Sequence, residues 1–161
     1  MLFTFCQWLE HTPLGTAIRE SAWLFPTIET VHLFGIILLV GSSLALGLRL
    51  LGLAFREERV SNLMRRYLPW TWAGFAVQVI TGSLLFASEA TKCYGNMVFR
   101  IKMVLILLAG VNALVFHTVV FRRAMTWDDA PAMPLSARLA GFFSIILWFG
   151  IVAAGRWISY Y

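Results

Sequence analysis

A glutamate and a histidine lie three positions apart at the start of a long apolar segment. Glu29 and His32 belong to WLFPTIETVHLFG, residues 23–35, and the chain then runs apolar to Leu48. Residues three apart share one face of a helix, so this carboxylate and imidazole can act on the same ligand. Di-metal sites in helix bundles use two Glu-x-x-His motifs, and this sequence has one. We therefore predict that His32 offers one ring nitrogen to a metal or cofactor, with Glu29 as its hydrogen-bond partner or a second ligand.

The other two histidines are weaker candidates for this site. His32 falls about 9 Å below the outer end of its span, whereas His117 falls roughly 30 Å below the same face. A haem iron held by two imidazoles brings the ligating nitrogens within about 4 Å of each other, so these two residues cannot share one haem. His11 is the alternative partner on the outer side. A structural interface role is the simpler interpretation of His117, which precedes Arg122 and Arg123.

The composition is that of an integral membrane protein. Hydrophobic residues make up 60% of the 161 residues, charged residues make up 13%, and the mean hydropathy is +0.77. The sequence predicts an all-α, polytopic four-helix bundle, because each apolar run approaches the roughly 20 residues that cross a bilayer as helix. The predicted spans are about 26–49, 67–89, 98–121 and 138–158 within a bundle domain of residues 26–161.

The first 25 residues are predicted to form an amphipathic segment at the membrane surface. Leu2, Phe5, Cys6 and Leu9 recur at helical spacing, and the Thr12-Pro13 pair is typical of the start of a second short helix. The short apolar start lacks a preceding Lys or Arg and a following small-residue cleavage site. We therefore expect this segment to remain on the mature chain.

Basic residues predict the orientation. Eight of the 13 fall in or beside the loops after spans one and three, and five fall on the other side. This bias places both loops in the cytoplasm and both termini in the periplasm of a bacterial inner membrane. The net charge of +5 then reflects topology and attraction to anionic lipid, and no nucleic-acid partner is expected.

Several ionisable groups share the outer layer with His32. Glu89, Lys102 and Arg156 lie near the ends of spans two, three and four, and they either form an ion-pair network that closes the bundle or belong to a binding site. Cys6 and Cys93 fall on the same side, where they either form a disulfide or remain two free thiols.

Small and amide residues predict how the helices meet. Small side chains allow backbones to approach closely in lipid, and an interhelical bond between amides would fix the register of two spans. Gln78 and Asn112 are the amides at mid-depth. The small residues are Ser43, Gly47, Gly82, Ser83, Gly110, Gly141 and Ser144.

Nearly the whole chain resembles an uncharacterised family of small four-span bacterial inner-membrane proteins. The resemblance is carried by WLFPTIETVHLFGIILLVGSSLALGLRLLG, LPWTWAGFAVQVITGSLLFASEA, FRIKMVLILLAGVNALVFH and GRWISY. The histidines in a small bundle are more distantly similar to those of b-type cytochromes and copper-resistance membrane proteins. The family pattern has an Asp before the Leu-Arg pair where this chain has Gly47, which argues against a carboxylate-based role on the cytoplasmic side.

These observations favour an accessory membrane subunit, redox-linked through a haem, metal or quinone site near the periplasmic face. Haem b, copper and quinone are the cofactors considered, and the partners expected are the lipid bilayer and a periplasmic or membrane redox protein within a larger complex. The alternatives are a small copper or proton transporter and a purely structural subunit. The sequence has no Cys-x-x-Cys-His, phosphate-binding loop or Gly-x-Ser-x-Gly motif.

Overall fold

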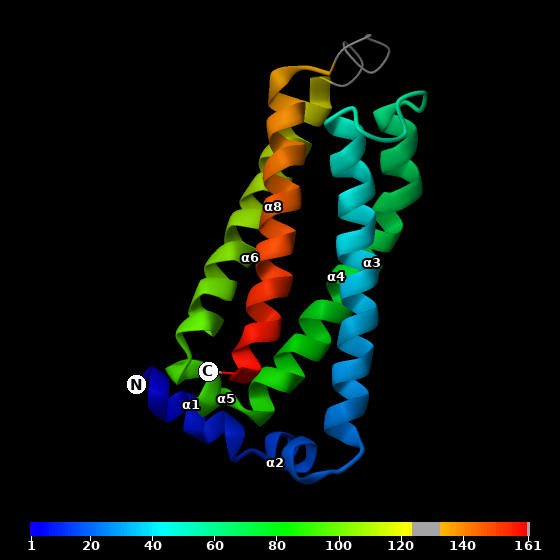
Figure 1. Cartoon of the computed structure of the whole chain (residues 1–161). Coiled ribbons are helices and arrows are strands. Elements are labelled where there is room, and N and C mark those ends of the chain that lie inside the picture. Colours follow the sequence, from blue (N-terminus) through cyan, green and yellow to red (C-terminus); the bar gives the residue numbers. More distant parts are fainter. Residues whose placement is uncertain (124–132, 161) are drawn as a thin grey trace.

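The computed structural model describes residues 1–123 and 133–160, and these residues form helices without any strand. Four long helices form a bundle in which each runs antiparallel to the one before it in the chain (Figure 1). They are α3 (Leu24–Leu50), α4 (Val60–Ser88), α6 (Met97–Val115, continued by the π-helical turn η1, Phe116–Val120) and α8 (Leu135–Trp157). The predicted all-α four-helix bundle is confirmed.

Large apolar side chains cover the outside of the bundle. Ile37, Leu107 and Phe149 are each about two-thirds exposed, although they lie in the middle of α3, α6 and α8. A protein in water would bury such residues, so this surface is suited to lipid. All four helices are long and apolar enough to cross a bilayer, which identifies a multi-pass membrane protein.

Two of the spanning helices begin at other residues than the hydropathy of the sequence predicted. The hydroxyl of Ser21 accepts hydrogen bonds from the backbone amides of Trp23 and Leu24, so α3 begins at Leu24 and Pro26 lies within its first turn. Helix α4 begins at Val60, seven residues before the apolar run, and includes Arg65 and Arg66. Basic side chains are good helix formers, so a helix can extend beyond the stretch that a hydropathy profile marks.

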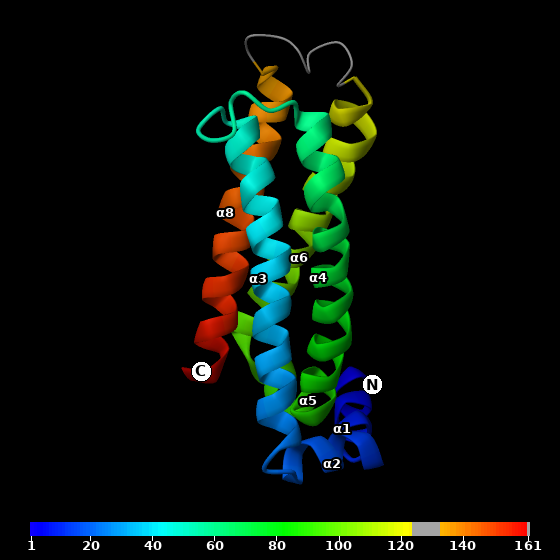
Figure 2. The same ribbon diagram turned by 90° about the vertical axis from the view of Figure 1, so that its right-hand side faces the viewer.

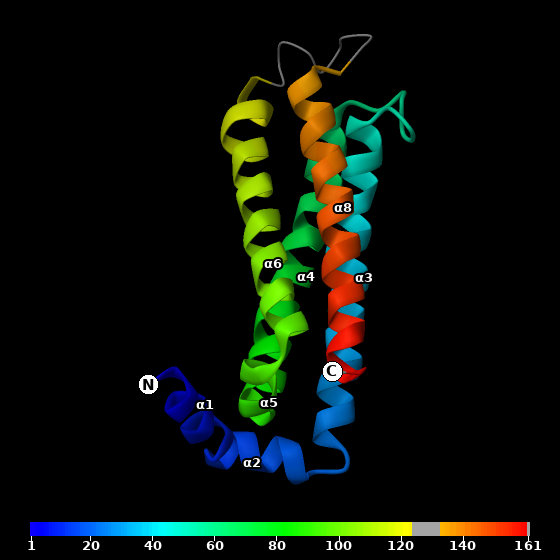
Figure 3. The ribbon, with the colours of Figure 1, turned by 60° about the vertical axis from the view of Figure 1, so that its left-hand side comes forward.

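The N-terminal segment folds into two short helices, α1 (Leu2–Glu10) and α2 (Pro13–Glu20), which lie across the end of the bundle that holds both chain termini (Figures 2 and 3). The Thr12 hydroxyl accepts a hydrogen bond from the Gly15 amide at 3.2 Å, and Pro13 occupies the first position of α2. Thr12 and Pro13 thus start the second helix as their sequence indicated. The short helix α5 (Ala90–Gly95) follows α4 at this same end.

Glycines set two close helix contacts. A methyl group at Gly74 of α4 would lie 2.6 Å from the backbone nitrogen of Leu39 in α3. A methyl group at Gly141 of α8 would lie 2.9 Å from the carbonyl oxygen of Gly47 in α3. The expected contact role is confirmed for Gly47 and Gly141, whereas nothing lies within 4 Å of a methyl group at Gly110.

The two mid-depth amides both bond across helices, but to backbone rather than to each other. Gln78 donates to the carbonyl oxygen of His32 at 2.6 Å, which joins α4 to α3. Asn112 donates to the carbonyl oxygen of Ala140 at 3.1 Å, which joins α6 to α8. The predicted bond between two amide side chains is therefore replaced by two amide-to-carbonyl bonds, one in each neighbouring helix pair.

The far end of the bundle is closed by an apolar cluster of Leu50, Val60, Met64, Phe116, Val120 and Ala137. Arg49, 6% exposed, lies beside it and donates to the carbonyl oxygen of Glu58 at 2.6 Å. The loop between α3 and α4 is at this end, opposite the chain termini (Figure 1). The basic residues assigned to one side of the membrane therefore do gather at one end of the molecule.

Candidate functional site

His32 lies about two turns into α3, roughly 12 Å along the helix from its start. The side chain is half-buried against α4, and its Nδ1 atom is 2.7 Å from the hydroxyl oxygen of Thr81. Thr81 itself is 6% exposed. A methyl group at Gly82 would come within 3.5 Å of the ring carbon Cε1, so the ring fits beside a position with no side chain.

The hydrogen bonds around Thr81 determine which nitrogen of His32 carries the proton. The Thr81 hydroxyl oxygen is 2.6 Å from the carbonyl oxygen of Val77, and a hydroxyl that donates to this carbonyl has no second proton to give to the ring. In that arrangement Thr81 accepts from His32, and the tautomer that fits carries its proton on Nδ1. The other nitrogen, Nε2, keeps its lone pair. Histidines that bind metals or accept from ligands are commonly oriented by a hydrogen bond on the opposite nitrogen in this way.

Glu29 does not bond the Nδ1 atom of the His32 ring. Its side chain is exposed on α3, and the hydrogen-bond partner of the His32 ring is Thr81 from the neighbouring helix. In this structure the Nδ1 atom of His32 bonds Thr81 in place of Glu29, and the role of Glu29 as a second ligand stays a prediction. Since α3 begins at Leu24, Glu29 is its sixth residue and lies beyond the first turn, where the helix dipole would favour a carboxylate.

Lys102 of α6 contributes a second polar group to the interior near His32. It is half-buried, and its ammonium group would lie 3.2 Å from a methyl group at Gly155 of α8. Its positive charge is near enough to the ring of His32 to act on it. Among the described residues it makes no hydrogen bond and no ion pair. A cation without a carboxylate partner inside a membrane bundle marks a place where an anionic or carbonyl oxygen would be stabilised.

The other two residues of the expected ion-pair network have different partners. Glu89 pairs with Lys92, three residues along the chain, at 3.6 Å. Arg156 contacts Tyr160, with a distance of 3.4 Å to the hydroxyl and 5.6 Å to the ring centre. Lys102 is thus left as the member that faces the interior.

His11 lies at the junction of α1 and α2, where it is exposed and its Nδ1 donates to the carbonyl oxygen of Gln7 at 2.7 Å. Helix α2 begins at the level of Ala87, since a methyl group at Gly15 would lie 2.8 Å from the Ala87 carbonyl oxygen. Ala87 is six residues, or about 9 Å, along α4 from Thr81. His11 and His32 therefore lie on different levels of the bundle.

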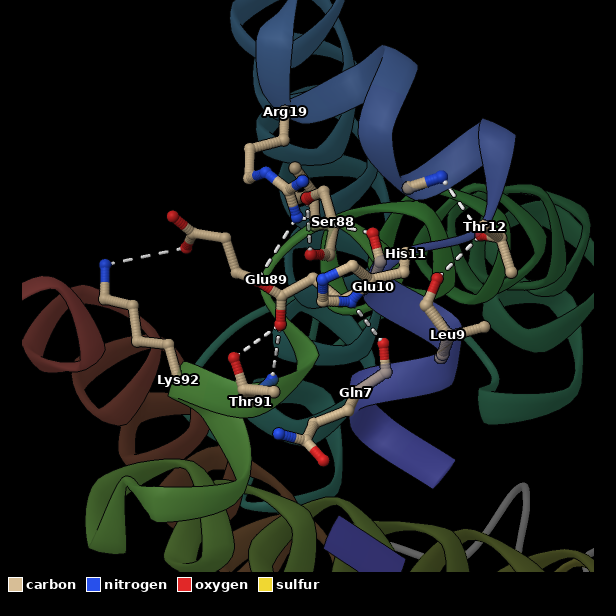
Figure 4. A network of polar contacts seen from close by, with 12 residues as sticks. Gln7, Leu9, Glu10, His11, Thr12, Arg19, Ser88, Glu89, Thr91 and Lys92 are labelled. Atoms are coloured by element: carbon tan, nitrogen blue, oxygen red, sulfur yellow. Dashed lines mark hydrogen bonds and ion pairs between the residues drawn. The ribbon is translucent and has the colours of Figure 1, made fainter. Parts of the chain in front are cut away.

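His11 belongs instead to a polar network that joins α1, α2 and α5 (Figure 4). Glu10 accepts hydrogen bonds from the backbone amide of Thr91, at 3.0 Å, and from its hydroxyl, and pairs with Arg19 at 3.2 Å. The Thr91 hydroxyl is the main cause that lowers the pKa of Glu10, with Arg19 adding to the effect. Sequence reasoning missed this network, because Glu10 and Thr91 are 81 positions apart and neither follows a motif.

His117 lies at the opposite end of the bundle from His32. It is exposed on η1, and its ring centre is 5.7 Å from that of Phe121. The structure thus separates these two histidines as the depth argument predicted. Within residues 1–123 and 133–160, no three His, Cys, Asp or Glu side chains come together as a metal-binding group.

The chain matches one protein family along almost its entire length. Residues 5–161 match a family of unknown function, DUF6644, and the chain belongs to this family. No curated protein and no solved structure matches it. The distant similarity to b-type cytochromes and copper-resistance proteins remains a prediction from the sequence.

Proposed function

We propose that this protein is an accessory membrane subunit that binds a redox-active quinone headgroup at His32. The observations that carry the proposal are the contacts of His32 Nδ1 with the Thr81 hydroxyl and of that hydroxyl with the Val77 carbonyl oxygen, from which we infer an accepting lone pair on Nε2. A neutral imidazole with one nitrogen held by a neighbouring helix is an oriented acceptor for a quinol hydroxyl.

Lys102 supports a quinone over the other cofactors considered. A quinone ring has two oxygens on opposite sides, so one can bond Nε2 of His32 while the ammonium of Lys102 attracts the other. A copper ion needs several protein ligands, and the described residues form no such group. A haem would have His32 as one axial ligand, with neither His11 nor His117 at the same level to be the second.

The site is also placed where a lipid-soluble ligand can reach it. His32 is half-buried within a span, close to the end of the bundle that carries the chain termini. Quinones diffuse within the bilayer, so such a ligand can enter between helices. With the predicted orientation, this end faces the periplasm, and α1 and α2 would lie where a periplasmic or membrane redox partner can dock.

The test is to purify the protein from membranes and measure extracted quinone by chromatography, together with iron, copper and the visible spectrum. We expect quinone in the wild-type protein, little or none in His32→Ala, and a reduced amount in Thr81→Val, which keeps the side-chain shape but no longer accepts the Nδ1 proton. His117→Ala is the matched control and should retain quinone.

Three outcomes would contradict the proposal. A haem or copper signal that disappears in His32→Ala would assign the same residue to another cofactor. Equal losses in folded His32→Ala and His117→Ala would place the site elsewhere. If added ubiquinone bound folded wild-type protein and folded His32→Ala equally, His32 would not be the quinone ligand, and Glu29 and His32 would have a structural role.

A further inference from the structure

Helix α1 is held against α5 by contacts near both of its ends. At one end the rings of Phe3 and Tyr94 lie with their centres 5.8 Å apart. At the other end Glu10 accepts the hydrogen bond from the backbone amide of Thr91 at 3.0 Å. Residue numbers rise along α1 as they fall along α5, so the two helices run in opposite directions across this contact, which we call the α1–α5 register.

The two cysteines of the chain lie inside this register. Cys6 falls between Phe3 and Glu10 on α1, and Cys93 falls between Thr91 and Tyr94 on α5. Both side chains are buried, with 5% of Cys6 and 9% of Cys93 exposed. The two thiols therefore lie in the segments of α1 and α5 that the flanking contacts of Phe3 with Tyr94 and of Glu10 with Thr91 hold together.

We propose that Cys6 and Cys93 are the partners of a disulfide that covalently fastens α1 to α5. Both residues are free thiols in the structure. In the proposed reaction each thiol loses a proton and one electron, and a bond forms between the two sulfur atoms. A disulfide oxidant accepts the two electrons and two protons and is reduced to two thiols.

A disulfide would add a covalent link to the hydrogen bonds from Thr91 to Glu10 that hold α1 against α5. The pair between Glu10 and Arg19 lies near the surface, where such pairs contribute little. Both cysteines lie at the end of the bundle predicted to face the periplasm, a compartment where disulfides form and persist. The bridge would keep the N-terminal segment in place over the end of the bundle.

Burial sets how fast this bridge can close. Desolvation raises the pKa of the Cys93 thiol to about 11, and the nearby Glu89 carboxylate adds to the effect. Little thiolate is therefore present at neutral pH, and the step in which Cys93 attacks should be slow. Its rate should rise about tenfold per pH unit below this pKa, because the thiolate fraction rises by that factor.

The experiment uses the full chain, reduced and refolded in detergent micelles or lipid, and then exposed to oxidised glutathione. At intervals the protein is denatured in acid, and its free thiols are labelled with a maleimide–polyethylene glycol reagent at mild pH under non-reducing conditions. We expect monomers that take up no label until they are reduced, and non-reduced digests that contain a peptide pair joined through Cys6 and Cys93. The rate of disulfide formation should rise about tenfold per pH unit below the pKa of Cys93.

Matched variants test the register. The double variant Cys6→Ser/Gln7→Cys moves the thiol by one residue to an exposed position of α1 and should bridge at least about tenfold more slowly, or not at all. Monomers that keep both thiols open to label after oxidation, or disulfides only between two chains, would overturn the proposal. Equal bridging by the double variant would overturn it too, since bridging would then not depend on the α1–α5 contact.

Discussion

Gly74→Ala tests whether the close contact between α3 and α4 determines stability. The added methyl group would lie 2.6 Å from the backbone nitrogen of Leu39 and 3.0 Å from its Cα. Ordinary contact begins near 3.4 Å, so the helices must move apart by about 0.8 Å, the difference between 3.4 and 2.6 Å. The neighbour is backbone, which cannot rotate away as the end of a flexible side chain can.

The expected change in the free energy of unfolding on Gly74→Ala is the difference between two opposing effects. Overpacking of this kind costs about 1–3 kcal/mol, while alanine in place of glycine within a helix stabilises by up to about 1 kcal/mol. Separation of α3 from α4 also lengthens the bond from Gln78 to the His32 carbonyl oxygen, now 2.6 Å. We therefore expect a net loss of about 1–2 kcal/mol in the free energy of unfolding.

The measurement is reversible unfolding in mixed micelles with increasing dodecyl sulfate, followed by circular dichroism. Gly110→Ala is the control, because a methyl group there meets nothing within 4 Å and only the gain in helix propensity remains. If Gly74→Ala proved as stable as Gly110→Ala, the close approach of α4 to Leu39 would not be a determinant of stability.

Three further predictions concern other parts of the molecule. Asn112→Leu should lower the free energy of unfolding by about 0.6–1.7 kcal/mol in the same micelle assay, because the bond to the Ala140 carbonyl oxygen is lost; an unchanged value would show that this bond adds nothing. The pKa of Glu10 is lowered from its unfolded value of 4.5, so its carboxylate stabilises the docked α1 above pH 4.5, and this stabilisation is lost as the pH falls through the folded pKa. Amide exchange in α1, corrected for intrinsic rates, should therefore rise on acidification in the wild type but not in Glu10→Gln. Reporter fusions after Phe55 should read cytoplasmic and fusions at the C-terminus periplasmic, and the reverse pattern would invert the membrane orientation.

The sequence predicted those features that depend on local composition. Four apolar runs of bilayer length specify four helices, because lipid leaves the backbone no other way to satisfy its hydrogen bonds. Thr12 and Pro13 start α2 through contacts within a few residues of one another. The opposite depths of His32 and His117 follow from helical rise along two spans.

Tertiary structure decided which partner each polar group has. The sequence predicted Glu29 as the hydrogen-bond partner of His32 because the two share a helix face. In the structure the His32 ring bonds Thr81, 49 positions away, because α3 packs against α4. The sequence allowed Lys102 to pair with Glu89, yet Glu89 is paired with Lys92, three residues along the chain. Periodicity describes one helix at a time, whereas the rotation and crossing of two helices depend on close contacts such as Gly74 against Leu39. The contact of the His32 ring with Thr81, from which the proposed tautomer is inferred, exists only because helix packing brings Thr81 to the ring.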